Sequence, residues 1–322
     1  MASIPHRWSS ADIPSQSGRL AVITGATGGL GYETALALAA AGAEVVLTGR
    51  NAAKGDAALR SIRALHPEAR IRFEPLDLAS LASVAGFAER LARHSAMVDL
   101  LVNNAGVMTP PTRQSTTDGF ELQFGTNYLG HFALTAHLLP LLLASSQQGR
   151  QARVVNLSSL AHRGGAIQFD DLQSQQRYRP WAAYGQSKLA MLMFAFELQR
   201  RSDTAGWGLM SNAAHPGYAR TDLIANGPGN DGLLSRLNLL VQPYVSQSAA
   251  DGALPTLFAA TAPEAEGAAY YGPNGFYELK GRVHEAFVAR QARSAEAASR
   301  LWRVSEELTH ARWPVASARR AA

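Results

Sequence analysis

The chain has 322 residues, of which 47% are hydrophobic, so it is long and apolar enough to bury a substantial core. It contains no cysteine, which excludes disulfides, thiolate nucleophiles and cysteine-based zinc or iron–sulfur sites. The net charge of +5 is compatible with a phosphate-bearing ligand, but the basic residues are scattered, and no block of them indicates a nucleic-acid contact.

Residues 1–17 form a polar leader that lacks the apolar centre of a signal peptide. The longest apolar run, residues 138–143, is interrupted by Pro140 and is much shorter than a membrane span. We therefore expect a cytoplasmic protein without a membrane span.

From residue 18 onward, short apolar segments alternate with segments of helical character. The expected strands are residues 19–24, 44–48, 71–74, 98–102, 153–157 and 209–214, and the expected helices are residues 34–41, 53–65, 81–93, 119–143, 184–200 and, after a gap, 286–308. This alternation predicts an α/β fold, a single Rossmann-type doubly wound parallel sheet with helices on both faces.

The sequence divides into one main domain and two flanking segments. Residues 18–280 form the predicted dinucleotide-binding catalytic domain, and residues 281–322 form a C-terminal helical extension and tail. The irregular stretch 218–247 contains apolar residues of its own, which favours a substrate lid over a linker.

A glycine-rich turn joins the first strand to the first helix. Glycines allow the backbone to turn sharply and to approach a pyrophosphate, whose charge is met by amides at the helix N-terminus. The strand–turn–helix context predicts a dinucleotide site. Its candidate residues are Gly25, Thr27, Gly28, Gly29, Leu30 and Gly31.

Arg50 and Asn51 follow the second expected strand. A carboxylate at this place would bind the ribose of NAD, whereas an arginine accommodates the 2′-phosphate of NADP. A guanidinium at position 50 can clamp that phosphate, although a plain surface arginine is the alternative. We expect NADP(H) to be the preferred cofactor, with NAD(H) possible.

Tyr184 and Lys188 are four residues apart in a segment with helical spacing, so they share one helix face. An ammonium close to a phenol favours the phenolate and lowers the pKa of the tyrosine. Such a tyrosine can give or take a proton.

These motifs occur in one order along the chain, together with Asn103-Asn104-Ala105-Gly106 after the fourth expected strand. In this the chain resembles the short-chain dehydrogenase/reductase family over residues 18–271. The Ser158-Ser159 pair, its spacing to Tyr184, and His215-Pro216-Gly217 resemble the retinol-dehydrogenase-like branch.

The resemblance implies four catalytic residues. Tyr184 would be the general acid/base, Lys188 would bind the nicotinamide ribose, and Ser159 would hold the substrate oxygen. Asn127 matches an asparagine whose backbone carbonyl positions a water beside the lysine. Further cofactor contacts implied by the resemblance are Asp77, Leu78, Asn104, Ala105, Gly106, Pro216, Gly217 and Thr221.

The implied reaction is a hydride transfer that interconverts a carbonyl and an alcohol without a metal. The pocket candidates Met108, Tyr178, Trp181, Tyr218, Leu223 and Ile224 are mostly apolar or aromatic, which suggests a lipophilic small molecule. By resemblance we expect a homodimer or homotetramer. For His162 and His215 we favour structural roles, because Tyr184 already supplies the proton.

Three alternatives use the same fold. Sugar-nucleotide epimerases share the Tyr/Lys pair but match the glycine turn less well, and protochlorophyllide reductases rely on cysteine, which this chain lacks. The third is a non-catalytic NADP-binding regulatory or scaffold protein, which loss of a catalytic residue would favour. All four catalytic positions are filled.

Overall fold

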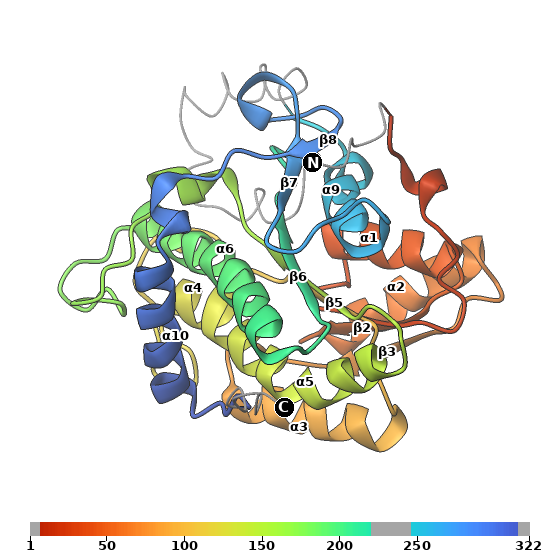
Figure 1. The fold of residues 1–322 in the computed structure, drawn as a ribbon, viewed down its shortest axis with the longest axis horizontal. Coiled ribbons are helices and arrows are strands. Elements are labelled where there is room, and N and C mark those ends of the chain that lie inside the picture. Colours follow the sequence, from red (N-terminus) through yellow and green to blue (C-terminus); the bar gives the residue numbers. More distant parts are fainter. Residues whose placement is uncertain (1–6, 220–245, 315–322) are drawn as a thin grey trace, which may run out of the picture.

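The computed structural model describes residues 7–219 and 246–314, and these residues form one eight-stranded sheet with helices on both faces (Figure 1). The strand order is β3-β2-β1-β4-β5-β6-β7-β8, and every pairing is parallel except that of β7 with β8. The predicted doubly wound α/β fold is confirmed. The strands are β1 Leu20–Ile23, β2 Glu44–Gly49, β3 Ile71–Pro75, β4 Leu100–Asn103, β5 Arg153–Leu157, β6 Met210–Ala214, β7 Tyr270–Pro273 and β8 Val283–Glu285.

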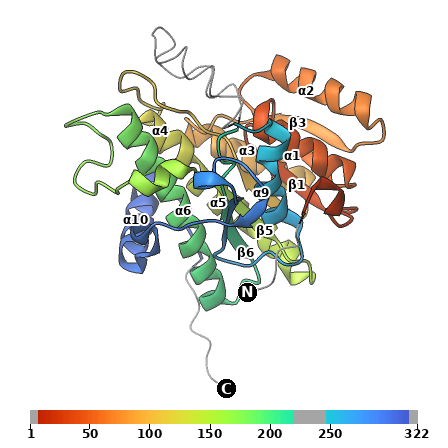
Figure 2. The same cartoon turned by 90° about the horizontal axis from the view of Figure 1, so that it is seen from above.

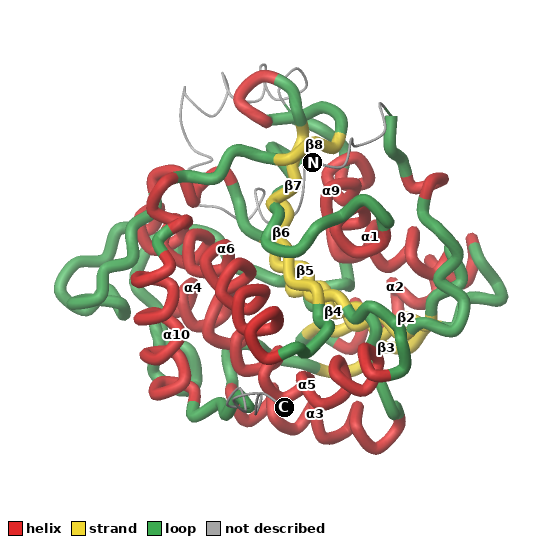
Figure 3. The backbone as a smooth tube through the Cα atoms, in the orientation of Figure 1, coloured by secondary structure: helices red, strands yellow, loops and turns green. Residues whose placement is uncertain are grey.

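Two layers of helices enclose the sheet, which runs through the middle of the molecule (Figure 3). One layer consists of α1 Gly29–Ala40, α2 Ala52–Leu65 and α9 Ala249–Thr261, and the other of α3 Leu81–His94, α4 Leu122–Phe124, α5 Gly130–Gln147, α6 Pro180–Ala205 and α10 Ala295–Thr309. Alternate side chains of each strand enter opposite cores: in β1, Val22 packs with the second layer and Ile23 with the first.

The strand order reverses between β1 and β4, which both pair with neighbours and with each other. In an open α/β sheet, ligands bind at the carboxyl ends of the strands near such a switch point. The fold therefore places the glycine turn after β1 and the segment after β4 on the same edge.

Before residue 206, three helices begin more than one residue away from the predicted start. Helix α1 begins at Gly29, inside the glycine turn, and α6 begins at Pro180, whose fixed φ suits the first helical turn. The expected helix 119–143 begins only at Leu122, and its residues Gly125–Leu129 form a π-helical turn that contains Asn127.

The C-terminal third holds elements that the sequence pattern did not reveal. Helix α9, with an internal Pro255, packs against α1, while β7 and β8 extend the sheet. The expected helix 286–308 is α-helical only over Ala295–Thr309, because β8 and a short 3-10 turn, Arg290–Arg293, precede it. Residues between 281 and 314 thus contribute to the same core, and α10 lies along α6 (Figures 1 and 2).

Within the described residues, one continuous helical run, Leu122–Gln147, is long and apolar enough to cross a membrane by length and composition. In this fold 67% of its apolar window is buried, and α5 forms part of the core against α3 and α6. A core helix passes the same test, so the absence of a membrane span stays a prediction.

Candidate active site

The glycine turn is packed so tightly that side chains at two of its positions would collide with their surroundings. Gly25 has φ +64°, and a Cβ there would lie 2.9 Å from the Cβ of Ala105. A Cβ on Gly31 would lie 2.5 Å from the carbonyl oxygen of Gly25. Gly28 is the N-cap of α1, so the free amides of the first helical turn lie at this edge and suit a phosphate.

Thr24, the residue that precedes this turn, fixes the segment after β4. Its Oγ1 accepts hydrogen bonds from the backbone amides of Asn104 (2.8 Å) and Ala105 (2.9 Å). The Asn104 side-chain amide donates in return to the Thr24 carbonyl oxygen at 2.7 Å. The structure thus brings the predicted cofactor residues of the two segments together.

His131 links Thr24 to Asn127, a role that was not predicted from the sequence. Its Nδ1 lies 2.8 Å from the Asn127 carbonyl oxygen, which can only accept, so Nδ1 carries the hydrogen and Nε2 accepts from the Thr24 hydroxyl at 2.8 Å. Burial lowers the pKa of His131 to about 3, against the opposing effect of the bond to Asn127. The ring is therefore neutral. The one available signal was a histidine four residues after Asn127 in an otherwise apolar helix.

The Asn127 side chain is also fully engaged. Its Oδ1 accepts from the Val107 amide at 2.8 Å, and its Nδ2 donates to Ser187 Oγ at 2.9 Å. These bonds join the segment after β4 to α6. A Cβ on Gly106 would lie 3.3 Å from Asn127 Oδ1 and 3.6 Å from Lys188 Nζ, so all three positions meet at one point.

Tyr184 and Lys188 lie buried on α6, with exposed fractions of 6% and 5%. The Lys188 ammonium is 5.9 Å from the centre of the Tyr184 ring and donates to the Leu157 carbonyl oxygen at 3.0 Å. Burial lowers the pKa of Lys188 to about 8. The pair predicted from helical spacing is therefore brought to the carboxyl end of β5.

The expected direction of the tyrosine pKa is wrong for this structure. Burial raises the pKa of Tyr184 to about 12, and the opposing effect comes from a hydrogen bond with Ser159. Burial disfavours the phenolate more than its surroundings stabilise it. Tyr184 is consequently protonated at neutral pH and can act as a proton donor.

The two serines after β5 have different partners. Ser158 Oγ donates to the Lys188 carbonyl oxygen at 2.8 Å, which holds α6 against the sheet. Ser159 Oγ accepts from the Ala161 amide at 3.2 Å, caps the 3-10 turn Leu160–Gly164, and is the serine hydrogen-bonded to Tyr184. The catalytic role of Ser159 stays a prediction.

Candidate residues for the adenosine half occupy the ends of β2 and β3. Arg50 is exposed directly after β2. Asn51 caps α2 by accepting from the Lys54 amide at 3.0 Å, and Asp77 Oδ1 accepts from the Ala79 amide at 3.0 Å. Leu78 is buried. Their contacts with a cofactor stay predictions.

The predicted pocket residues are only partly gathered around Tyr184. The Trp181 ring is 66% exposed and packs edge-on to that of Tyr184 at 6.1 Å, whereas Tyr178 donates to the Pro110 carbonyl oxygen at 2.8 Å. Met108 and Tyr218 are half-buried. Thr221, Leu223, Ile224 and almost all of the expected lid 218–247 lie outside the described residues.

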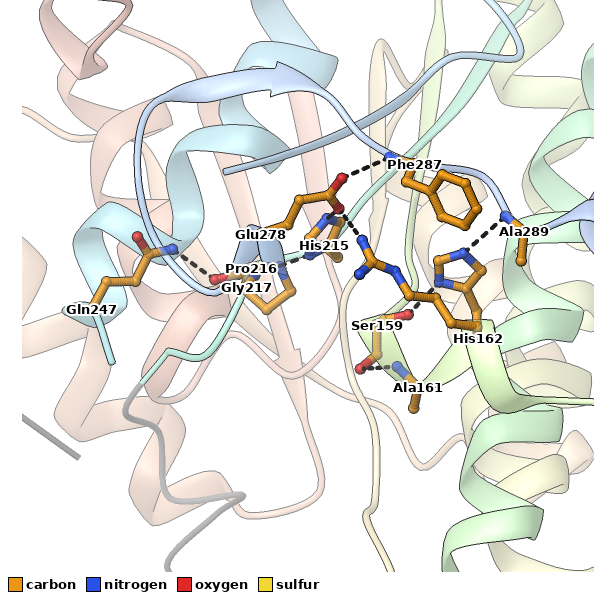
Figure 4. Close-up of polar contacts among 11 residues, drawn as sticks. Ser159, Ala161, His162, His215, Pro216, Gly217, Gln247, Glu278, Phe287 and Ala289 are labelled. Carbon is orange, nitrogen blue, oxygen red and sulfur yellow. Dashed lines mark hydrogen bonds and ion pairs between the residues drawn. The ribbon is translucent and has the colours of Figure 1, made fainter. Parts of the chain in front are cut away.

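His162, His215 and Glu278 form a polar cluster beside Ser159 (Figure 4). Burial lowers the pKa of both histidines, that of His162 to about 4, so each is neutral at pH 7. Both are held by hydrogen bonds, as the expected structural roles require. Glu278 had no signal in the sequence.

Among residues 7–219 and 246–314, no group of three or more histidines and carboxylates is arranged to hold a metal ion.

Comparison with known proteins finds a matching family model, similar named proteins and similar solved structures. Residues 19–229 match the family model described as short chain dehydrogenase. The chain is 43% identical to mouse polyprenol dehydrogenase over 93% of its own length and 86% of the relative's, and 41% identical to mouse retinol dehydrogenase 12 over 92% and 88%. The NADP complex of Pseudomonas aeruginosa RhlG has a similar structure, with a TM-score of 0.61 and 27% identity over 78% of this chain and 92% of that one.

Proposed function

The chain belongs to the short-chain dehydrogenase/reductase family, in its retinol-dehydrogenase-like branch, and we propose that it interconverts a carbonyl and an alcohol on a lipophilic small molecule with NADP(H). One observation carries the proposal: the buried pair Tyr184 and Lys188 lies with Ser159 at the sheet edge that also holds the glycine turn. The enzyme would be an oxidoreductase of this family.

The residues at this edge fit a nicotinamide dinucleotide. Gly25, Gly31 and Gly106 have no side chain at positions where a Cβ would meet neighbouring atoms, so a ligand can approach the backbone there. The first turn of α1 has free amides at the same edge. When bound, the nicotinamide would donate or accept the hydride. Gly106 also opens the space beside the Lys188 ammonium, which is placed to bind ribose hydroxyls.

Tyr184 and Ser159 would handle the proton and the substrate oxygen. A phenol with a pKa near 12 holds its proton at pH 7, so Tyr184 protonates the oxygen of a carbonyl substrate as it is reduced. Ser159 donates a hydrogen bond to the same oxygen and stabilises the charge that develops on it. Tyr184 and the neighbouring Lys188 are buried, which would limit the access of water to this step.

The relatives and the pocket candidates support a lipophilic substrate. Two of the relatives are named for dehydrogenation of polyprenol and of retinol, which are long apolar alcohols. Met108, Trp181 and Tyr218 would offer an apolar surface near Tyr184 to such a chain. We therefore propose long-chain allylic alcohols and their aldehydes as the first substrates to assay.

Arg50 is proposed to select NADP(H) over NAD(H). A guanidinium paired with a phosphate contributes about 1.5–3 kcal/mol, which is roughly a 10- to 150-fold difference in affinity. Arg50→Ala should therefore weaken NADPH binding by about that factor and leave NADH binding nearly unchanged, measured by calorimetry. Arg60→Ala, a surface change on α2, is the control. Equal affinities of the wild type for NADPH and NADH would contradict the assignment.

A further inference from the structure

Glu278 joins three segments of the chain through one carboxylate. Its Oε2 accepts from His215 Nε2 at 3.0 Å and from Arg163 Nη2 at 2.7 Å, and its Oε1 accepts from the Phe287 amide at 2.9 Å (Figure 4). The carboxylate is 16% exposed. Burial acts to raise the pKa of Glu278, but these bonds and the charge of Arg163 outweigh it, so the pKa is lowered and the group is ionised at pH 7.

On one side, Glu278 determines the backbone after β6. Because His215 Nε2 donates to the carboxylate, the neutral ring has a free lone pair on Nδ1, which accepts from the Gly217 amide at 3.1 Å. The backbone around Glu278 also covers this segment: a Cβ on Gly217 would lie 2.3 Å from the Leu279 carbonyl oxygen, and the Tyr218 amide donates to the same oxygen at 2.7 Å.

On the other side, Glu278 supports the turn that carries Ser159. Arg163 belongs to the 3-10 turn Leu160–Gly164 that Ser159 caps. The Phe287 amide leads to Ala289, whose amide donates to His162 Nε2 at 3.4 Å, and His162 Nδ1 donates to the Ser159 carbonyl oxygen at 2.7 Å. Both routes from the carboxylate end at the backbone of the catalytic serine.

The backbone at Glu278 is itself in an unfavourable conformation. Tyr277 and Glu278 have backbone φ angles of +48° and +59°, in a region that residues other than glycine rarely adopt. Two successive residues of this kind persist only where the surroundings determine them, and such sites cluster where function requires a fixed geometry. Here the surroundings are the bonds to Arg163 in the turn after β5, to His215 directly after β6, and to Phe287 before α10.

We propose that Glu278 is a positioning residue that aligns the Pro216–Gly217 segment with Ser159, so that the nicotinamide and the substrate oxygen meet in register. This rests on the proposed function and on the family resemblance, which implies that Pro216 and Gly217 contact the nicotinamide. The strands concerned are neighbours, because β5 and β6 pair along their whole length up to Leu157 and Ala214. Because His215, Arg163 and the Phe287 amide all donate, both side-chain oxygens at position 278 must be hydrogen-bond acceptors.

Glu278→Gln is the decisive variant, since it keeps the shape but turns one acceptor into an NH₂ group that must face a donor. We expect NADPH binding to weaken by about tenfold and kcat to fall by a similar factor. Binding of 2′-phospho-ADP-ribose, which lacks the nicotinamide, should stay within about twofold. Glu285→Gln, an exposed glutamate on β8, is the matched control and should behave as the wild type.

A second variant separates the effect of Glu278 on the serine turn from its effect on the segment after β6. Arg163→Met releases the serine turn but leaves the bond of Glu278 to His215, so kcat should fall while the affinity for NADPH is retained. Wild-type affinity and kcat in Glu278→Gln would overturn the proposal. So would equal weakening of both nucleotides together with a lower melting temperature, because that pattern means a purely structural role.

Failure of the proposed function has a different signature. A wild-type protein that binds neither NADPH nor NADH removes the premise, and the positioning role with it. If the wild type binds NADPH but turns over none of the assayed substrates, Glu278 is still tested in full by comparing the binding of NADPH and 2′-phospho-ADP-ribose to Glu278→Gln.

Discussion

Burial acts on Tyr184 and Lys188 in opposite directions, and this sets their protonation. Each group is pushed toward its neutral form, so the phenol keeps its proton up to a pKa near 12 while the pKa of the ammonium falls to about 8. Divergent shifts of adjacent groups are typical of acid/base sites. The residue types and spacing predicted the pair, but the direction of the tyrosine shift depends on burial, which the sequence does not report.

The cost of burying Lys188 predicts that its removal stabilises the protein. A pKa lowered from 10.5 to about 8 corresponds to about 3 kcal/mol, from which the lost bond to the Leu157 carbonyl subtracts about 1 kcal/mol. Lys188→Met should therefore raise the free energy of unfolding by about 2 kcal/mol at pH 7 while abolishing turnover.

The pH dependence of that gain follows from the sign of the shift. The unfolded chain binds the Lys188 proton more strongly, so the wild type gains stability as the pH rises from about 8 to 10.5, and the advantage of the variant disappears over the same range. Urea unfolding at pH 7 and pH 10.5 measures it, with the exposed Lys54→Met as control. An identical gain at both pH values would show that charge burial is not the cause.

Residues whose partners are close in sequence were the predictable part of the site. Tyr184 and Lys188 share a helix face, and the glycine turn is one contiguous motif. His131 and Glu278 act through partners 107 and 63 residues away, Thr24 and His215. Only the tertiary fold makes those contacts.

At the scale of elements, the Thr24 hydroxyl is the junction between β1 and the segment after β4. The hydroxyl oxygen accepts hydrogen bonds from two backbone amides, and the hydroxyl donates to the His131 ring. Thr24 is fully buried, so water cannot replace these partners. An unsatisfied buried donor costs about 1–3 kcal/mol.

Thr24→Val, which keeps the shape but removes the acceptor, should thus lower the free energy of unfolding by about 2–4 kcal/mol and weaken nucleotide binding. Denaturant unfolding measures the loss. Thr204→Val on the exposed end of α6 should cost less than about 0.5 kcal/mol. A Thr24 variant as stable as this control would mean that the two amides find other partners.

Helix α9 and strands β7 and β8 show where local patterns stop being informative. The helix is rich in alanine and carries Pro255 in its interior, so its sequence gives weak helical periodicity. The strands have four and three residues, and β8 pairs in the antiparallel sense. Packing against α1 and β6 determines these elements more than their own composition does.

At the scale of the whole molecule, the C-terminal segment completes the core on the α6 side of the sheet. Trp302 of α10 packs against Phe132 of α5 at 5.0 Å, Phe194 of α6 at 5.7 Å and Trp313 at 4.4 Å, and it is 1% exposed. The sequence predicted a doubly wound sheet from its alternation, but it did not predict this cluster. A homodimer or homotetramer stays a prediction, and any pairing through α6 would have to use the surface that α10 leaves uncovered.

Trp302→Ala should therefore lower the free energy of unfolding by about 3–5 kcal/mol, because it leaves a cavity among the aromatic rings. Trp181→Ala, the same truncation at a side chain 66% exposed, should cost about 1 kcal/mol or less. Thermal unfolding of both variants measures the difference. Equal losses would indicate that α10 is not part of the cooperative core.

In the proposed reaction, Tyr184 is the proton donor of a nicotinamide-dependent reductase. Its most direct test is the absorbance of NADPH in the presence of lipophilic aldehydes and ketones, retinal included, for the wild type and Tyr184→Phe. We predict that the wild type oxidises NADPH, and that the variant is slower by about 10²- to 10⁴-fold while its NADPH affinity is retained. A Tyr184→Phe protein that reduces the same substrate at the wild-type rate would show that Tyr184 is not the proton donor.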